Sequence, residues 1–267
     1  MNPTLYLLEV LKIPMEDPFS PEDWKDWYHY VMFDPVTQSR LLFNICVSGR
    51  PIRGNITTTV FLTVPEQLRY QSIASLDHFH TYGFSDTIEW NNEIRRHPFS
   101  IETENTFLSI ENDRARIKID HRKSGIRLYV DGISVATPLY IPELAPFGKG
   151  FIGWGLIPGV DITGTISIGN KTISVNPGWH CYHDHNYGRF NWGDDVGWTW
   201  FVASLQNGKG IKTTYIFHRS NNKSFTEVGV PFLFIYENNQ LKKIFLGDSV
   251  DIKWNWTPSP HMPPVLP

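Results

Sequence analysis

The stretch FLSIENDRARIKIDHRKSGIRLYV, residues 107–130, decides the fold class of this chain. It contains three short runs rich in Ile, Leu and aromatic residues, at 107–110, 114–120 and 126–130. Such residues favour β-strands, and the intervening Glu111-Asn112-Asp113 and Lys123-Ser124-Gly125 favour tight reversals of the chain. We therefore predict consecutive antiparallel hairpins here, with a further turn at Asp131-Gly132.

The same pattern continues on both sides of this stretch. Further strand-like runs, several flanking turn signals rich in Gly and Asn, lie at residues 41–47, 55–64, 165–168, 172–175, 198–205, 211–218, 232–236, 241–246 and 251–256. Helical periodicity is scarce: Ser20-Pro21-Glu22-Asp23 either caps a short helix or leads into a first strand over residues 27–33. A series of this kind predicts an all-β chain whose antiparallel strands close into barrels.

A boundary between two such barrels is predicted over residues 137–149. Pro138, Pro142, Pro146 and Gly148 interrupt the strand pattern there. This divides the chain into a domain at 1–137 and a domain at 138–267. A short echo agrees with two related halves, because residues 78–83 (HFHTYG) match 183–188 (HDHNYG) at both His, the Tyr and the Gly, through duplication or coincidence.

Composition excludes several classes of function. The net charge is −3 with no basic cluster, which argues against nucleic acid and anionic membrane surfaces as partners. No run of about 20 apolar residues exists to span a bilayer, and residues 5–12 make a poor signal peptide, so we expect a cytoplasmic protein without stable membrane insertion. Two cysteines are too few for a disulfide framework. Phosphate loops, nucleotide fingerprints and nucleophile elbows are missing, so we expect no cofactor.

Aromatic residues make up 14% of the chain, and seven of the ten Trp lie from Trp154 onward. Such a cluster indicates either a large core or an apolar pocket. The stretch with the highest density of aromatic and polar side chains is GWHCYHDHNYG, residues 178–188. If residues 182–187 form a strand, then Tyr182, Asp184 and Asn186 share one face, and His183, His185 and Tyr187 share the other.

Asp184 is the candidate for acid chemistry in this stretch. A carboxyl group among aromatic rings loses hydration, which favours its protonated form and lets it donate a proton to an alkene. Faces of Trp198 and Trp200 could then stabilise a carbocation. Two alternatives stay open. Asp184 could bond backbone N–H groups, and His183 and His185 could bond across strands or share a metal with His180 or His218, although we expect no metal because an acidic or Cys partner is missing.

The run YHDHNYG at 182–188, with Trp198 and Trp200 downstream, resembles the signature of the carotenoid 1,2-hydratase-like superfamily. That group is similar in fold to lipocalin-like Diels–Alderases of polyketide pathways. The segment from Glu22 to Tyr30 resembles its opening Trp-Tyr strand. The resemblance implies two tandem lipocalin-like barrels, and implicates Tyr182 and Asp184 in protonating an isoprenoid double bond. It also implies an upstream His–Trp pair, for which Trp154 is a candidate, while residues 150–159 contain no His.

Together these features predict a cofactor-independent cyclase or isomerase of secondary metabolism that acts on an apolar isoprenoid or polyene. The predicted catalytic residues are Asp184, Tyr182, His183 and His185. The predicted substrate-binding residues are Trp154, Trp179, Asn186, Trp198, Trp200 and Tyr187. Three alternatives remain: a hydratase (a hydro-lyase) that adds water to a terpenoid double bond, a pericyclase of the Diels–Alderase type that preorganises its substrate, and a non-catalytic carrier of a lipid or pigment.

Overall fold

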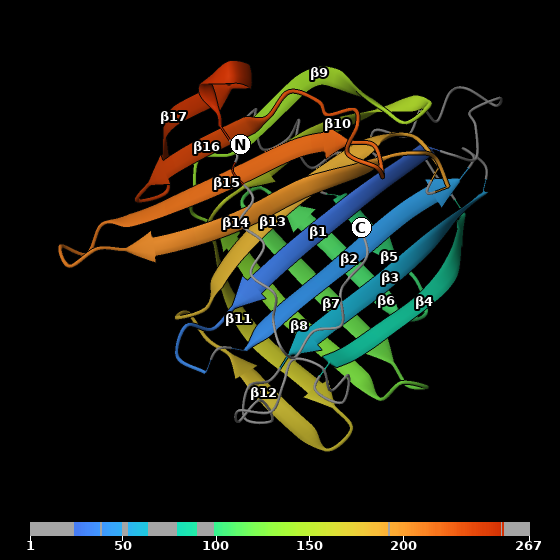
Figure 1. Ribbon diagram of the computed structural model, residues 1–267. Coiled ribbons are helices and arrows are strands. Elements are labelled where there is room, and N and C mark those ends of the chain that lie inside the picture. Colours follow the sequence, from blue (N-terminus) through green and yellow to red (C-terminus); the bar gives the residue numbers. More distant parts are fainter. Residues whose placement is uncertain are drawn as a thin grey trace, which may run out of the picture.

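Antiparallel strands make up most of the structure (Figure 1), a computed structural model that describes residues 24–37, 39–49, 53–63, 79–89, 99–191, 193–251 and 253. Within these ranges the one helical element is a 3₁₀ turn, Gly247–Ser249. No helix among them is long and apolar enough to cross a membrane. The all-β prediction is confirmed.

The strands form three sheets. The first has seven strands in the order β4 (Phe79–Glu89), β3 (Arg53–Thr63), β2 (Arg40–Gly49), β1 (Trp24–Phe33), β13 (His180–Arg189), β10 (Gly150–Ile157) and β9 (Leu139–Phe147). The second has six: β12 (Lys171–Val175), β11 (Val160–Ile168), β8 (Ile126–Ser134), β7 (Arg114–His121), β6 (Thr106–Glu111) and β5 (Phe99–Glu102). The third has four: β14 (Gly197–Gln206), β15 (Lys212–Asn221), β16 (Phe232–Glu237) and β17 (Gln240–Leu246).

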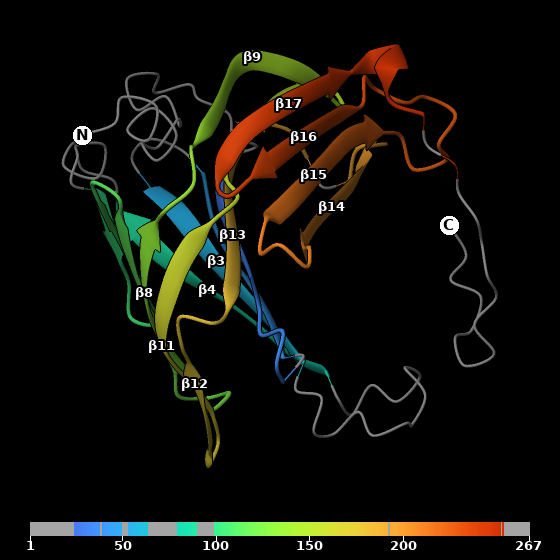
Figure 2. The same cartoon turned by 90° about the vertical axis from the view of Figure 1, so that its left-hand side faces the viewer.

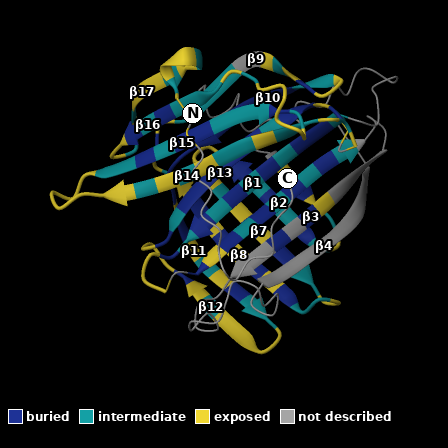
Figure 3. Ribbon diagram, in the orientation of Figure 1, coloured by how far each residue is buried: buried dark blue, intermediate teal, exposed yellow. Residues whose placement is uncertain are grey.

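The first sheet lies between the other two, as the side view in Figure 2 shows. Its face toward the second sheet carries the main hydrophobic core, which includes Tyr28, Tyr30 and Phe43, all almost fully buried. Its face toward the third sheet carries a smaller core around Tyr182 and Phe234. The alternation of buried and half-buried residues along β1 follows from this two-sided packing (Figure 3). The central strands β1 and β13 are therefore shared by both cores.

Turn chemistry explains most of the hairpins. Asn112, Gly125, Gly169, Asn238 and Asn239 all have positive φ between 47° and 71°, which Asn and Gly tolerate best. The turns predicted there are confirmed.

The turn predicted at Asp131-Gly132 is wrong, because both residues lie inside β8. There Gly132 lets β11 approach closely, since a Cβ atom would meet Val160 Cγ1 at 2.9 Å.

The proline-rich segment at 137–149 is not a break between strands: it contains β9. Pro142 and Pro146 are tolerated because β9 is an edge strand, and because Pro142 falls where its pairing with β10 is irregular. The first-strand alternative for residues 27–33 is confirmed, with β1 beginning at Trp24. The run predicted at 251–256 lies mostly outside the described residues, and Asp251 and Lys253 are not in a strand.

The division into residues 1–137 and 138–267 stays a prediction. Residue 137 falls between β8 and β9, which belong to different sheets, but both larger sheets contain strands from each side of it. The echo at residues 78–83 lies outside the part of the chain whose side chains are described.

Candidate active site

Strand β13 carries the predicted motif through the middle of the first sheet. It pairs with β1 on one side, where His29 lies opposite Asp184, and with β10 on the other, where Trp154 lies opposite Asn186. The predicted alternation of faces is confirmed. Asp184 and Asn186 face a cavity on the side of the third sheet, whereas His183 and His185 face the main core.

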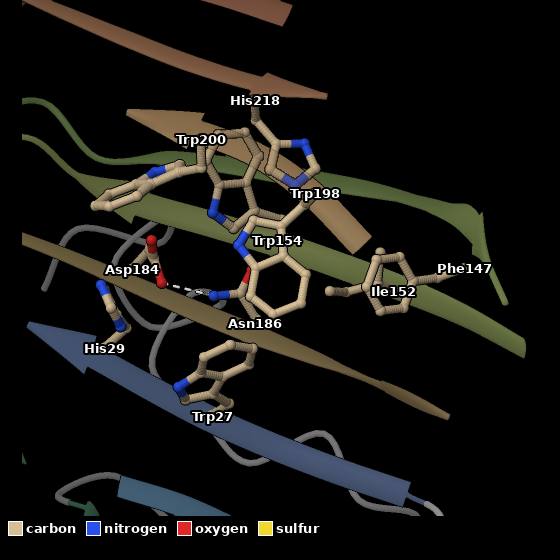
Figure 4. Close-up of a pocket in the computed structure, with 10 residues that line it drawn as sticks. All are labelled: Trp27, His29, Phe147, Ile152, Trp154, Asp184, Asn186, Trp198, Trp200 and His218. Atoms are coloured by element: carbon tan, nitrogen blue, oxygen red, sulfur yellow. Dashed lines mark hydrogen bonds between the residues drawn. The ribbon is translucent and has the colours of Figure 1, made fainter. Parts of the chain in front are cut away.

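The cavity has a volume of about 60 Å³ and walls that are mostly aromatic. Its lining residues, drawn in Figure 4, come from β1, β9, β10, β13, β14 and β15: Trp27, His29, Phe147, Ile152, Trp154, Asp184, Asn186, Trp198, Trp200 and His218. Among these described lining residues, Asp184 is the only carboxylic acid. It is 4% exposed, and Asn186 Nδ2 donates a hydrogen bond of 2.6 Å to its Oδ1. The other oxygen, Oδ2, takes no part in this hydrogen bond.

Two residues of β1, Trp27 and His29, were not predicted as site residues. Both bond the same side-chain oxygen on β2: Trp27 Nε1 donates to Asn44 Oδ1 at 2.9 Å, and His29 Nδ1 also contacts that oxygen. Because an amide oxygen only accepts, His29 must carry its hydrogen on Nδ1, which leaves Nε2 as an acceptor. The sequence signal was the spacing of 27 and 29, which puts both on one face of a strand. The pairing of that strand with β13 is not visible in the sequence.

His218 on β15 completes the set of imidazoles at the cavity. Its ring packs on the Trp154 indole with 5.0 Å between ring centroids. Burial lowers the pKa of His218 to about 4, so the ring is neutral at neutral pH. The upstream His that the resemblance implied beside Trp154 stays a prediction; the His that packs on Trp154 in the structure is His218, which lies downstream in the sequence.

Tyr182 lies next to Asp184 along the same face of β13 and is 3% exposed. Burial, together with the nearby Asp184 carboxyl, raises its pKa well above the usual value, so the hydroxyl stays protonated. No described group meets hydrogen-bond geometry with that hydroxyl, nor with the Trp200 indole N–H beside it. Both residues also border a second cavity, of about 480 Å³.

His183 and His185, predicted to be catalytic, are not brought to either of these cavities. His183 Nδ1 lies 3.0 Å from the His29 backbone carbonyl oxygen, and its ring stacks on Tyr30. His185 Nε2 lies 2.7 Å from Asp26 Oδ1, with both side chains fully buried. The metal alternative conflicts with this geometry, because the sheet separates these rings from His218, and the described residues hold no group of three metal-ligating side chains.

Trp179 and Tyr187, predicted to bind substrate, also lie away from the cavity. Trp179 is 3% exposed and belongs to the main core. The Tyr187 hydroxyl hydrogen-bonds the Tyr140 hydroxyl at 3.1 Å, and its ring covers Gly153 of β10. The remaining predicted residues, Asp184, Asn186, Trp154, Trp198 and Trp200, converge on the cavity, with Tyr182 adjoining them.

Several solved structures have an architecture similar to that of this chain. No family model and no curated protein sequence matches the chain. A candidate AttH protein from Nitrosomonas europaea superposes with a TM-score of 0.58 at 14% identity, over 90% of this chain and 73% of that one. Kievitone hydratase from Nectria haematococca superposes with a TM-score of 0.53 at 12% identity, over 90% of this chain and 68% of that one.

CghA, solved with Sch210972, gives a TM-score of 0.53 at 10% identity, over 82% of this chain and 58% of CghA, so the chain spans less than two thirds of that protein. Identities this low establish a shared fold alone. The chain has the fold common to these proteins, in agreement with the fold that the resemblance implied.

Proposed function

We propose that this protein is a cofactor-independent cyclase or isomerase that acts on an apolar small molecule of the isoprenoid or polyene class. The observation that carries the proposal is Asp184, the one carboxylic acid among the described residues that line an aromatic cavity. Burying such a group costs free energy, and a protein that only carries an apolar ligand gains nothing from it. This favours an enzyme over a carrier.

Asp184 acts as the proton donor in this proposal. The proton on Oδ2 passes to one carbon of a substrate double bond, whose π electrons form the new C–H bond and leave a carbocation on the other carbon. A second double bond of the same molecule can then attack the cation and close a ring, which moves the positive charge to a carbon of that second bond. With or without ring closure, a carbon next to the cation finally loses a proton and a new double bond forms. The Asp184 carboxylate accepts a proton at the end, so the product has the mass of the substrate.

The surrounding residues stabilise the charges that develop. The faces of Trp27, Trp198 and Trp200 present negative quadrupoles to a cation. The protonated Tyr182 hydroxyl offers a hydrogen bond, and Nε2 of His29 offers an acceptor beside Asp184. In this proposal His183 and His185 are positioning residues, which hold β13 in place through their contacts on the main-core side of the sheet.

Hydration is the second candidate, and the volume of the cavity favours it. A volume of about 60 Å³ is enough to hold water beside Asp184, since a cavity needs about 10–15 Å³ to hold one water. Water held by His29 would attack the cation, and the product would gain one water. A pericyclase or a carrier would not need the acid. The cytoplasmic location stays a prediction.

The proposal is tested in the source organism with the gene deleted and then restored as the wild type, as Asp184→Asn or as Asp113→Asn. Asp113 lies in an exposed turn, so Asp113→Asn removes one carboxylate away from the cavity and serves as the matched control for Asp184→Asn. We expect the wild type and Asp113→Asn to convert an accumulated precursor, and Asp184→Asn to leave it unconverted although it melts like the wild type. An unchanged mass indicates cyclisation or isomerisation, and one added water indicates hydration. Conversion by Asp184→Asn would refute the acid role and leave a pericyclase or a carrier.

A further inference from the structure

The cavity that holds Asp184 is too small for the substrate proposed above. Ligand sites for drug-sized molecules have volumes of about 300–1,000 Å³, whereas this cavity has about 60 Å³. The second cavity, of about 480 Å³, is within that range. Trp200 lines both, so the two spaces adjoin each other along one indole.

One end of the second cavity is cationic. Strand register puts Arg40, Phe33 and His180 in one row across β2, β1 and β13, and all three line the cavity. The Arg40 guanidinium lies 5.7 Å from the centre of the Phe33 ring. Among its described lining residues the cavity has no carboxylic acid.

His180 adds a hydrogen-bond donor to this end. Lys212 Nζ lies 3.0 Å from His180 Nδ1, and because an ammonium group only donates, His180 must carry its own hydrogen on Nε2. Burial and the Lys212 charge lower the pKa of His180, so the ring is neutral. Burial also lowers the pKa of Lys212, while the nearby Asp161 raises it.

The other end of the cavity points to the catalytic acid. It is bordered by Tyr182 and Trp200; the Tyr182 hydroxyl interacts with the Asp184 carboxyl and the Trp200 indole N–H, although no described group meets strict hydrogen-bond geometry with that hydroxyl or that N–H. Buried polar groups are usually paired, so these two are suited to a ligand. Between the two ends, Val31, Phe201 and Val202 supply apolar wall.

We propose that the second cavity binds the body of the substrate, and that the substrate is an elongated apolar molecule with a carboxylate at one end, held by Arg40 and His180. This inference rests on the proposed function. His180 and Asp184 are four positions apart along β13, which is about 13 Å at about 3.3 Å per residue. The reacting double bond therefore lies about 13 Å from the carboxylate.

The test uses two saturated probes that cannot react, decanoate and decanol, whose binding at pH 8 is followed by tryptophan fluorescence. We expect wild type to bind decanoate about fivefold more tightly than decanol, the size of effect that a partly exposed ion pair gives. Arg40→Gln should remove this preference without weakening decanol, and Arg40→Lys should restore part of it. Arg116→Gln, which removes an exposed charge on β7, is the matched control and should behave as wild type.

One further arm keeps the result decisive. Val202→Trp should weaken both probes by filling the cavity, and equal binding by this variant and the wild type would place the probes elsewhere. Equal affinities in the wild type, no measurable binding of decanoate, or an equal loss of both probes in Arg40→Gln would each overturn the carboxylate site. None of these outcomes depends on turnover, so failure here leaves the acid role of Asp184 standing, and failure of Asp184 as an acid leaves this site standing.

Discussion

At the scale of single residues, three imidazoles at the site and behind it differ in the groups that they contact. His29 contacts an amide oxygen, His185 contacts a carboxylate behind the site, and among the described residues the contact recorded for the His218 ring is its packing against Trp154. An imidazole without a charge partner in a buried place resists protonation. His218 is therefore the group whose protonation depends most simply on burial.

His218 predicts a loss of stability in acid. The folded protein binds the proton only below about pH 4, whereas the unfolded chain binds it below 6.5. Between these values the unfolded state holds more protons, so stability falls as the pH drops from 6.5 toward 4. Between pH 7 and pH 5 the free energy of unfolding should fall in both proteins. We expect the fall to be about 2 kcal/mol smaller in His218→Phe, which keeps the stacking on Trp154, than in the wild type. Urea unfolding at both pH values measures this, and parallel losses in the two proteins would contradict it.

Breaking the buried pair of Asp26 and His185 should lower the stability of the protein substantially. Asp26→Ala leaves His185 buried without its carboxylate, which costs about 3 kcal/mol or more of unfolding free energy. Asp131→Ala breaks the exposed pair with Arg116 and should cost less than about 1 kcal/mol. Chemical denaturation of both variants gives the comparison. A similar small loss in each would mean that the buried pair does not stabilise β13.

The sequence identified the residues of the β13 motif, but not all of their surroundings. Alternation along one strand is a local property, so the separation of Asp184 from His185 by face could be predicted. Which face borders a cavity could not, because both faces of β13 are buried against different sheets. His29 was missed for a related reason: its place beside Asp184 depends on pairing between strands distant in sequence.

At the scale of elements, hairpins with Asn or Gly turns were predicted well, whereas the proline-containing edge strand β9 was not. Turn residues with positive φ mark a reversal wherever they occur, as Gly169 does. Proline gives an ambiguous signal, because it ends a central strand but is accepted at an edge. Pro142 and Pro146 predicted a boundary where the chain forms β9, and this hid β10 as well.

Strand β10 depends on a glycine that makes room for an aromatic ring. A Cβ atom at Gly153 would lie 2.2 Å from Cζ of Tyr187. Gly153→Ala must displace that ring and its bond to Tyr140, so we expect a loss of about 2 kcal/mol in stability. Gly193→Ala is the matched control, because a Cβ there meets nothing within 4 Å. Thermal denaturation separates the two, and equal melting temperatures would show that Tyr187 moves freely.

At the scale of the whole molecule, the pairing of β1 with β13 joins the beginning of the described chain to its second half. Ten residue pairs run from Trp24 opposite Arg189 to Phe33 opposite His180. A fragment of residues 138–267 would lose this partner and expose the edge of β13.

The full chain should therefore unfold in one transition, and the fragment 138–267 should not fold alone. Circular dichroism and tryptophan fluorescence of the full chain should report the same urea midpoint. A cooperative unfolding transition in the isolated fragment would instead support two independent domains divided at residue 137.

The two faces of strand β13 have different roles, and this constrains how the protein can evolve. Even-numbered positions from His180 to Asn186 border the cavities, while His183 and His185 hold the strand in the core. Substitution at an even position changes what the cavities accept and leaves the main core intact. Insertion or deletion of one residue exchanges the two sets and destroys both. Lineages of this protein can therefore acquire new substrates through point mutations in β13, but not through changes in its length.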